Sequence, residues 1–252
     1  MREKVENNSD RVNIPQILIL HGWGRGAISW QKTKELLENN GFSVLAPDLP
    51  GFGENPMSPT PWTINDYVEW VENLCQENGF YHFFLLGHSF GGRVAIKFAL
   101  KYPEQLAGLI LVSAGGVENE KTVKELTAAI LAPYAKKFSF LPGYKLWRKV
   151  FYRFILGRTD YLQAQGVMKE TFKNIVAENL TPLLEKIRVK TLIVWGENDR
   201  TLPLSDGRLM NQKIPGSQLE VLPNIDHKPH QENPQKLVEI IMSFMMRNSK
   251  NR

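Results

Sequence analysis

Three residues that lie far apart in the sequence could together perform nucleophilic catalysis. Ser89 stands in the segment Gly87-His88-Ser89-Phe90-Gly91, whereas Asp199 and His227 follow much later in the chain. A serine hydroxyl is a weak nucleophile until a neighbouring imidazole accepts its proton, and a carboxylate can hold that imidazole in the required tautomer. The residue types therefore predict a nucleophile, a general base and an orienting acid, provided that the fold brings them together.

The segment around Ser89 has the G-x-S-x-G pattern of a nucleophile elbow. An apolar run, 83–86, precedes Gly87, and a helical pattern follows as far as Lys101. The turn is so tight that side chains two positions either side of the serine would collide, which explains Gly87 and Gly91. The helix after the turn would point its amino end at the site, where it favours negative charge.

Five histidines are candidates for the general base, and their positions favour His227. His82 precedes a predicted strand and would lie at the wrong edge of the sheet. His88 adjoins the nucleophile with its side chain directed elsewhere, and His21 is expected to organise loops. His230 could share a metal with His227, but no third ligand is evident, so we predict no metal site. A neutral imidazole at His227 can take the serine proton and return it to the leaving group.

Two aspartates compete for the role of orienting acid. Asp199 follows the apolar run that ends at Trp195, and it is the predicted acid. Asp226 is the alternative, but a residue adjacent to His227 rarely folds back onto its own ring. Asp48 is expected to bind backbone amides in its own turn instead.

Backbone amides near Ser89 are the predicted oxyanion-hole donors. One is the amide of Phe90, the residue after the nucleophile, and the other is that of Trp23 in the loop 21–24. The Trp23 side chain would then line the acyl pocket and contact substrate.

The elements that must position these residues alternate between strands and helices. Continuous apolar runs of four or five residues predict strands buried on both faces of a parallel sheet, at 16–20, 43–46, 83–86, 108–112, 191–195 and 219–222. Helical patterns between them predict an α/β fold with a doubly wound, mostly parallel sheet. Ligands bind at the carboxyl ends of the strands in such sheets, which is where the candidate residues follow.

Three helix starts can be recognised from capping residues. Ser29 is predicted to cap a helix over 30–38, and Thr63 with Asp66 resembles a capping box. Asn233 followed by Pro234 is typical of an N-cap with proline at the first helical position.

One connection, from 113 to 190, is too long for a single helix and too apolar to be disordered. We predict a helical cap at 117–188 inserted into a core formed by 1–116 and 189–252. Trp147 and Phe151 lie on the apolar face of its most apolar helical pattern, and we expect them to contact substrate. Basic residues lie towards the other face, so the same helix could lie on an anionic membrane. We favour the cap over a membrane-associated lipase.

Charge and composition exclude several classes of protein. The net charge is +5, but residues 118–190 hold 14 Lys and Arg against 7 Asp and Glu, and the remainder holds 17 against 19. A uniformly basic nucleic-acid-binding protein would not show this distribution. One cysteine in 252 residues fits a reducing compartment, and no apolar leader or membrane-spanning run is present. We therefore expect a cytoplasmic protein with a small-molecule partner.

Residues 14 to about 246 resemble the α/β-hydrolase superfamily with a helical cap. The resemblance is carried by HGWG at 21–24, DLPGFG at 48–53, GHSFGG at 87–92, WGEND at 195–199 and IDHKPHQENP at 225–234. The HGWG loop is similar to that of bacterial carboxylesterases that act on pimeloyl-carrier-protein methyl esters, although their elbow usually has tryptophan where His88 stands. The chain also resembles meta-cleavage C–C bond hydrolases.

The resemblance implies a serine hydrolase that cleaves carboxylic esters through an acyl-enzyme and needs no cofactor. C–C bond, lactone and thioester substrates stay open, because the same triad serves them all. A ligand receptor that keeps the fold, as in some plant hormone sensors, is the alternative that is not an enzyme. The sequence leaves the oligomeric state and the natural acyl and alcohol groups open.

Overall fold

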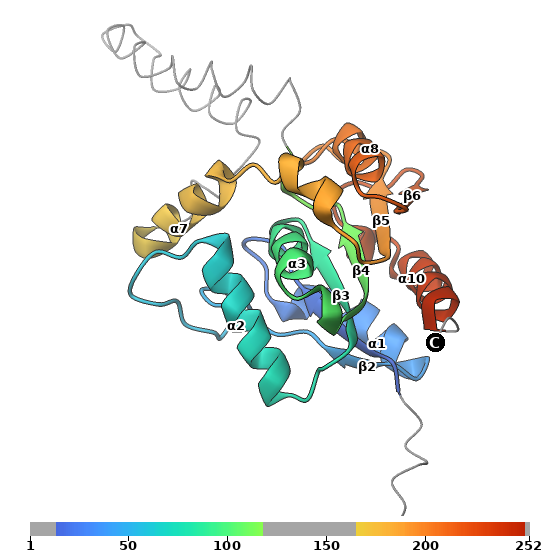
Figure 1. Cartoon of the computed structure of the whole chain (residues 1–252), viewed down its shortest axis with the longest axis horizontal. Coiled ribbons are helices and arrows are strands. Elements are labelled where there is room, and N and C mark those ends of the chain that lie inside the picture. The colour runs from blue at the N-terminus through green and yellow to red at the C-terminus, as the bar shows by residue number, and fades with distance from the viewer. Residues whose placement is uncertain (1–13, 118–164, 250–252) are drawn as a thin grey trace, which may run out of the picture.

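A computed structural model describes residues 14–117 and 165–249 of the chain. Within them, a six-stranded sheet has the order β2-β1-β3-β4-β5-β6, and all of its strand pairs are parallel (Figure 1). The strands are β1 (Gln16–Leu20), β2 (Ser43–Leu45), β3 (Phe83–His88), β4 (Leu106–Val112), β5 (Thr191–Gly196) and β6 (Gln218–Leu222). The predicted fold class is confirmed, and the predicted strands differ from the observed ones by no more than two residues at either end.

Helices cover both faces of the sheet, as expected for a doubly wound fold. The described helices are α1 (Gln31–Asn39), α2 (Ile64–Glu77), α3 (Phe90–Lys101), α7 (Gly166–Ala177), α8 (Leu204–Lys213), α9 (Pro229–Glu232) and α10 (Pro234–Ser249). Short 3₁₀ helices are η1 (Ala27–Trp30), η2 (Pro103–Gln105) and η4 (Thr181–Lys186). Helices α2, α3 and α8 pack on one face, and α1 and α10 pack on the other.

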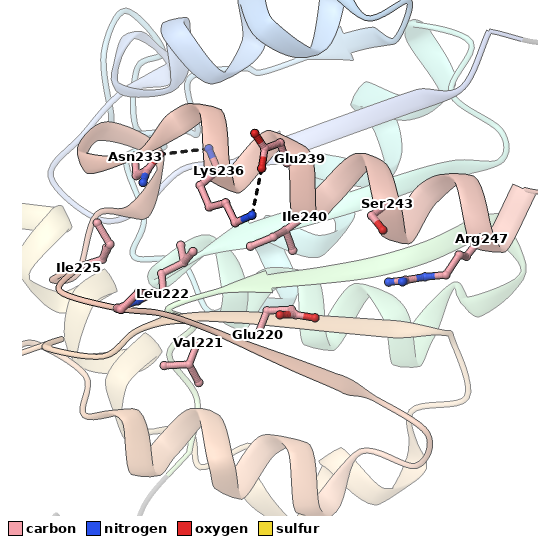
Figure 2. A pocket seen from close by; sticks show the side chains of 11 residues that line it. Glu220, Val221, Leu222, Ile225, Asn233, Lys236, Glu239, Ile240, Ser243 and Arg247 are labelled. Atoms are coloured by element: carbon pink, nitrogen blue, oxygen red, sulfur yellow. Dashed lines mark hydrogen bonds and ion pairs between the residues drawn. The ribbon is translucent and has the colours of Figure 1, made fainter.

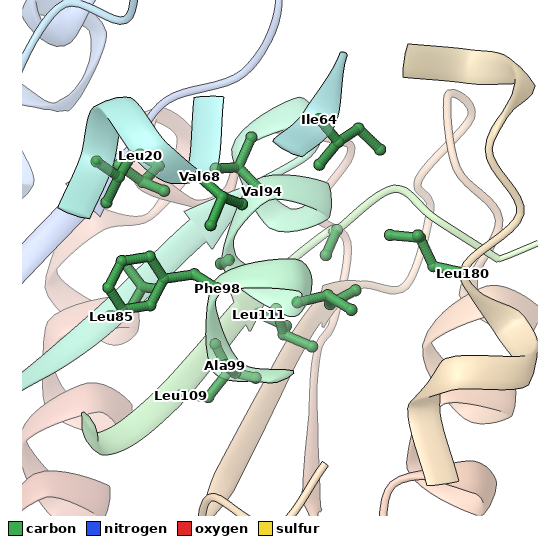
Figure 3. Packing of buried hydrophobic residues seen from close by; sticks show 14 of the residues in the cluster. Leu20, Ile64, Val68, Leu85, Val94, Phe98, Ala99, Leu109, Leu111 and Leu180 are labelled. Carbon is green, nitrogen blue, oxygen red and sulfur yellow. The ribbon is translucent and has the colours of Figure 1, made fainter. Parts of the chain in front are cut away.

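The strands read as continuous apolar runs because each face of the sheet has its own core. Leu85 and Leu109 point towards α2 and α3, where Val68 and Phe98 lie in the same cluster (Figure 3). Their strand neighbour Phe84 belongs to the cluster on the opposite face. Successive residues of a strand point to opposite faces, so a strand covered on both sides has no polar alternation.

Two of the three predicted helix starts are confirmed. The Thr63 side chain accepts a hydrogen bond from the Asp66 amide, and the Asp66 carboxylate accepts one from the Thr63 amide, forming a reciprocal capping box. At the start of α10, Oδ1 of Asn233 accepts a hydrogen bond from the Lys236 amide. Each cap satisfies a backbone donor that the first helical turn leaves free.

The prediction that Ser29 caps the first helix was wrong. The chain forms the 3₁₀ helix η1 before α1, so the helix N-cap is Trp30, which makes no side-chain cap. The Ser29 hydroxyl instead donates to the Gly26 carbonyl oxygen at 2.8 Å. A serine can satisfy its hydroxyl locally within a turn as readily as at a helix end, and the local bond is the one formed here.

The division into a core and a cap at 117–188 stays a prediction, because most of the proposed cap lies outside the described residues. Trp147 and Phe151 lie there as well. What the structure does describe is the return segment, with α7 and η4 leading back to β5. Within residues 14–117 and 165–249, no helix combines the length and apolar character needed to cross a membrane.

A surface hollow of about 470 Å³ lies between the edge strand β6 and α10 (Figure 2). Lys236 and Glu239 form an ion pair of 3.0 Å beside it. The side chains that line it include neither Ser89 nor His227. It is therefore not the site that the candidate catalytic residues form.

Candidate active site

Ser89 lies at the point where the sheet order reverses. β1 pairs with β2 on one side and with β3 on the other, so the chain crosses the sheet before β3 begins. Ser89 is the single residue between β3 and α3, with φ 51° and ψ −110°, a backbone conformation that is strained for a residue with a side chain. Strain at a partly exposed serine on a switch point is typical of a functional site.

The glycines around Ser89 are required by close backbone contacts. A Cβ atom on Gly87 would collide with the Gly91 carbonyl, and one on Gly91 would collide with the Leu20 carbonyl. A Cβ on Gly22 would lie 2.8 Å from Nδ1 of His88 and 3.3 Å from Cβ of Ser89. The loop after β1 therefore lies directly against the elbow.

His227 and Asp199 form a hydrogen-bonded pair. Nδ1 of His227 lies 2.8 Å from Oδ2 of Asp199, whose side chain is fully buried. The other oxygen of Asp199 accepts hydrogen bonds from the amides of Thr201 and Leu202, at 2.9 and 2.8 Å. A carboxylate can only accept, so Nδ1 of His227 carries the hydrogen of this bond, and in the neutral ring the lone pair is therefore on Nε2.

Asp226 serves its own loop and, among the described residues, makes no hydrogen bond to the ring of His227. Its Oδ1 accepts hydrogen bonds from the amides of Arg200 and His227, at 3.0 and 2.8 Å. Its Oδ2 accepts one from Nε of Arg200 at 2.8 Å. The carboxylate of Glu232 accepts hydrogen bonds from the amides of Asp226 and Lys228. Arg200 and Glu232, which the sequence did not single out, thus brace the loop that carries His227.

The structure brings this loop to the elbow. The carbonyl oxygen of His227 lies 2.9 Å from Nε2 of His88, and the two rings are 5.0 Å apart. Ser89, Asp199 and His227 therefore gather at one edge of the sheet, after β3, β5 and β6 respectively.

The loop after β1 presents Trp23 to the same edge. The Trp23 ring makes edge contacts with Phe52, Phe90 and Phe172, at centroid distances of 4.9, 5.4 and 4.9 Å. Within residues 14–117 and 165–249, neither the Trp23 nor the Phe90 amide donates a hydrogen bond. The rings of Trp23, Phe52, Phe90 and Phe172 thus form an aromatic wall, and the amides of Trp23 and Phe90 are available as donors next to it.

His21 and Asp48 hold the loops that surround this wall. Nδ1 of His21 lies 2.8 Å from the Gly22 carbonyl, and its Nε2 accepts a hydrogen bond from the Leu49 amide at 3.0 Å. Burial lowers the pKa of His21, in keeping with a neutral ring that has both nitrogens engaged. The Asp48 carboxylate accepts hydrogen bonds from the amides of Ala27 and Glu54, as predicted for a structural residue.

Helix α7 covers the aromatic wall and is anchored to the core. Nη1 of the buried Arg93 side chain donates to the carbonyls of Ile175 and Glu178, at 3.0 and 2.8 Å. In addition, the Trp62 amide donates to the buried hydroxyl of Thr171 on the same helix at 3.0 Å. Sequence reasoning missed Arg93. A cation near the amino end of a helix is unfavourable, so an arginine in the first turns of the elbow helix could have indicated a structural role.

The comparisons with known proteins agree with this fold. A monoacylglycerol lipase, ABHD6 of Bos taurus, is 27% identical, covering 92% of this chain and 75% of the lipase. A 2-hydroxy-6-oxononadienedioate/2-hydroxy-6-oxononatrienedioate hydrolase of Comamonas testosteroni is 26% identical, covering 91% of this chain and 87% of that protein. Among solved structures, an esterase from Exiguobacterium antarcticum superposes with a TM-score of 0.71 at 21% identity, covering 92% of each chain. The model of the alpha/beta hydrolase family matches residues 17–240, and the chain therefore belongs to this family.

Proposed function

We propose that the protein is a serine hydrolase that cleaves carboxylic esters of small or medium acyl groups through an acyl-enzyme. The observation that carries the proposal is the His227–Asp199 pair, whose loop is hydrogen-bonded to His88, the residue before the strained Ser89. In this proposal, Ser89 is the nucleophile, His227 the general base and Asp199 the orienting acid. The amides of Trp23 and Phe90 form the oxyanion hole.

The first half of the reaction forms the acyl-enzyme. Oγ of Ser89 attacks the ester carbonyl carbon while Nε2 of His227 accepts the hydroxyl proton. The carbonyl oxygen becomes an oxyanion, which the two free amides stabilise. The carbon–oxygen bond to the alcohol then breaks, and His227 returns the proton to the leaving oxygen.

The second half releases the acyl group. A water molecule gives a proton to His227 and attacks the acyl carbon, and Ser89 recovers its proton as the carboxylic acid departs. Throughout, Asp199 keeps the hydrogen on Nδ1 and stabilises the imidazolium. The reaction needs no cofactor.

The aromatic wall supports an apolar acyl group. Trp23, Phe52 and Phe172 offer ring edges next to the proposed oxyanion hole. We extend the proposal to Trp147 and Phe151 as substrate contacts on the strength of their sequence pattern alone.

Cleavage of a C–C bond is the second candidate, because the relative from Comamonas testosteroni is a 2-hydroxy-6-oxononadienedioate/2-hydroxy-6-oxononatrienedioate hydrolase. Lactones and thioesters suit the same residues. A ligand receptor of this fold would bind such compounds with little or no turnover.

A substrate panel tests the proposal. We expect hydrolysis of p-nitrophenyl acetate and butyrate that a serine-directed phosphonate abolishes, with the phosphonate found on Ser89 by peptide mass spectrometry. Turnover of a 2-hydroxy-6-oxo-dienoate at a kcat/KM above that of every ester would establish the C–C candidate. Binding without turnover of any panel member would contradict enzymatic function.

A further inference from the structure

His88, the residue before the proposed nucleophile, is buried and makes contacts that its position in the elbow does not require. Its ring packs against those of His227, His230 and Trp30, at centroid distances of 5.0, 4.6 and 5.9 Å. Trp30 in turn stacks on His230 with the rings 4.2 Å apart and nearly parallel. The rings of His88, His230 and Trp30 therefore form one packed cluster, which contacts His227 through His88.

The hydrogen bonding of His88 defines its tautomer. Nε2 lies 2.9 Å from the carbonyl oxygen of His227, and a carbonyl can only accept, so Nε2 carries a hydrogen. Nδ1 is buried beside Gly22 and has no hydrogen-bond partner within the described residues. A hydrogen on the buried, unpartnered Nδ1 would be unsatisfied, which favours the neutral ring, and burial lowers the pKa of His88 well below the ordinary value for histidine.

We propose that His88 is a positioning residue, whose Nε2–H holds the main chain of His227 at the distance from Ser89 that proton transfer requires. The inference rests on the proposed function of Ser89 and His227. His227 lies on a loop between β6 and α9, where Asp199 holds its ring and Asp226 holds its amide from within the same loop. The bond from His88 fixes the backbone of the base to the residue next to the nucleophile, so that both reacting groups share one support.

The neutral state of His88 matters for the same step. When His227 accepts the serine proton it becomes a cation, and a second cation 5.0 Å away would oppose this in a buried site. The titratable groups that face His88 are His21, His227 and His230. Burial also lowers the pKa of His21 and of His230. These two rings therefore favour their own neutral forms, and His227 is the one neighbour of the three that gains a charge in the proposed reaction.

Two substitutions at His88 separate the hydrogen bond from the bulk of the ring. His88→Gln keeps an N–H donor near the position of Nε2, whereas His88→Met fills a similar volume without a donor. We expect His88→Met to lower kcat for p-nitrophenyl acetate on the order of 10- to 100-fold with little change in KM, as for a displaced reacting group. We expect His88→Gln to stay within about threefold of wild type.

His230→Phe is the matched control. It preserves the stack on Trp30, and the His230 side chain makes no hydrogen bond to His227 within the described residues. We expect its kcat to equal that of wild type. A loss as large as that of His88→Met would mean that ring packing, and not the hydrogen bond, supports the base, and would overturn the proposal.

A readout independent of turnover distinguishes this proposal from the proposed function. The proton between His227 and Asp199 should give a low-field ¹H resonance in protein labelled with ¹⁵N-histidine. We expect that resonance to persist in His88→Gln and to shift or broaden in His88→Met. An unchanged resonance and kcat in folded His88→Met would overturn the role of His88, while failure of the proposed function would instead show as turnover that survives Ser89→Ala.

The design stays decisive if His88→Met does not fold. In that case His88→Gln, verified as folded by its thermal unfolding, carries the test alone. A tenfold or greater loss of kcat in folded His88→Gln would mean that the imidazole itself is needed, which contradicts the proposal.

Discussion

Nδ1 of His227 lies 2.8 Å from Oδ2 of Asp199, and the second oxygen of that carboxylate is held by the amides of Thr201 and Leu202. The carboxylate thus has a fixed orientation before any substrate binds. A base that is oriented in advance loses little free energy to reorganisation when the proton moves. The predictions below follow from this pair and from the residues around it.

Ser89→Ala should abolish ester hydrolysis without unfolding the protein. The hydroxyl is the proposed nucleophile, and loss of a nucleophile that acts as one unit with its base costs on the order of 10⁴-fold or more in kcat. The measurement is p-nitrophenyl butyrate turnover by the purified variant, with circular dichroism as the folding control. If the folded variant kept a tenth of wild-type turnover, the proposed mechanism would be contradicted.

Asp199→Asn should lower kcat far more than Asp226→Asn. An amide at 199 can donate to His227 and favour the wrong tautomer, an effect that costs about 10⁴-fold in a well-studied serine protease. Asp226 instead pairs with the exposed Arg200, and a pair at the surface contributes little because solvent screens it. Both variants should be compared at saturating substrate, and equal losses would refute the assignment of Asp199.

The free energy of unfolding should fall as the pH drops below about 6.5. Burial lowers the pKa of His230 to about 3 and that of His88 well below its ordinary value. Between the folded and unfolded pKa values the unfolded chain binds more protons, so acid favours unfolding. Urea unfolding from pH 4.5 to 8 checks the slope, which should be shallower in His230→Phe. An identical slope in that variant would contradict the burial argument.

Arg93→Met should loosen α7. Removing the guanidinium leaves the Ile175 and Glu178 carbonyls without their donor, and a buried polar group left unsatisfied costs about 1–3 kcal/mol. Lys97→Met is the control, because Lys97 pairs with the Glu178 side chain from the same helix but near the surface. We expect unfolding in urea to show the larger loss for Arg93→Met, together with a raised KM. A smaller loss than that of Lys97→Met would contradict the anchoring role.

Phe172→Ala should change acyl-chain preference more than the rate on a very small ester. Its ring contacts Trp23 at 4.9 Å and forms part of the aromatic wall. The ratio of kcat/KM for p-nitrophenyl butyrate to that for acetate should shift severalfold, since one methylene in an apolar pocket is worth about 1–3 kcal/mol. Tyr81→Ala removes an exposed aromatic residue that precedes β3 and should leave the ratio unchanged. An unchanged ratio in Phe172→Ala would exclude the wall from the acyl site.

The sequence by itself determined the strands, the elbow and the chain order of the candidate residues. These features depend on local signals: apolar runs for strands buried on both faces, glycines where no Cβ fits, and reciprocal side-chain bonds such as that of Thr63 and Asp66. Such signals fail where a side chain has two local hydrogen-bond partners to choose between. The Ser29 hydroxyl bonds within its own turn instead of capping a helix, and η1 precedes α1.

The sequence favoured Asp199 over Asp226, but only the tertiary structure shows that Asp199 meets the ring of His227 and where His88 points. Asp226 is adjacent to His227 in sequence, yet its oxygens are taken by Arg200 and by the His227 amide, whereas the distant Asp199 reaches the ring. His88 likewise meets a carbonyl from a loop that follows the last strand. Hydrogen bonds between segments depend on how the strands are ordered in the sheet, and residue type and spacing along the chain do not contain that information.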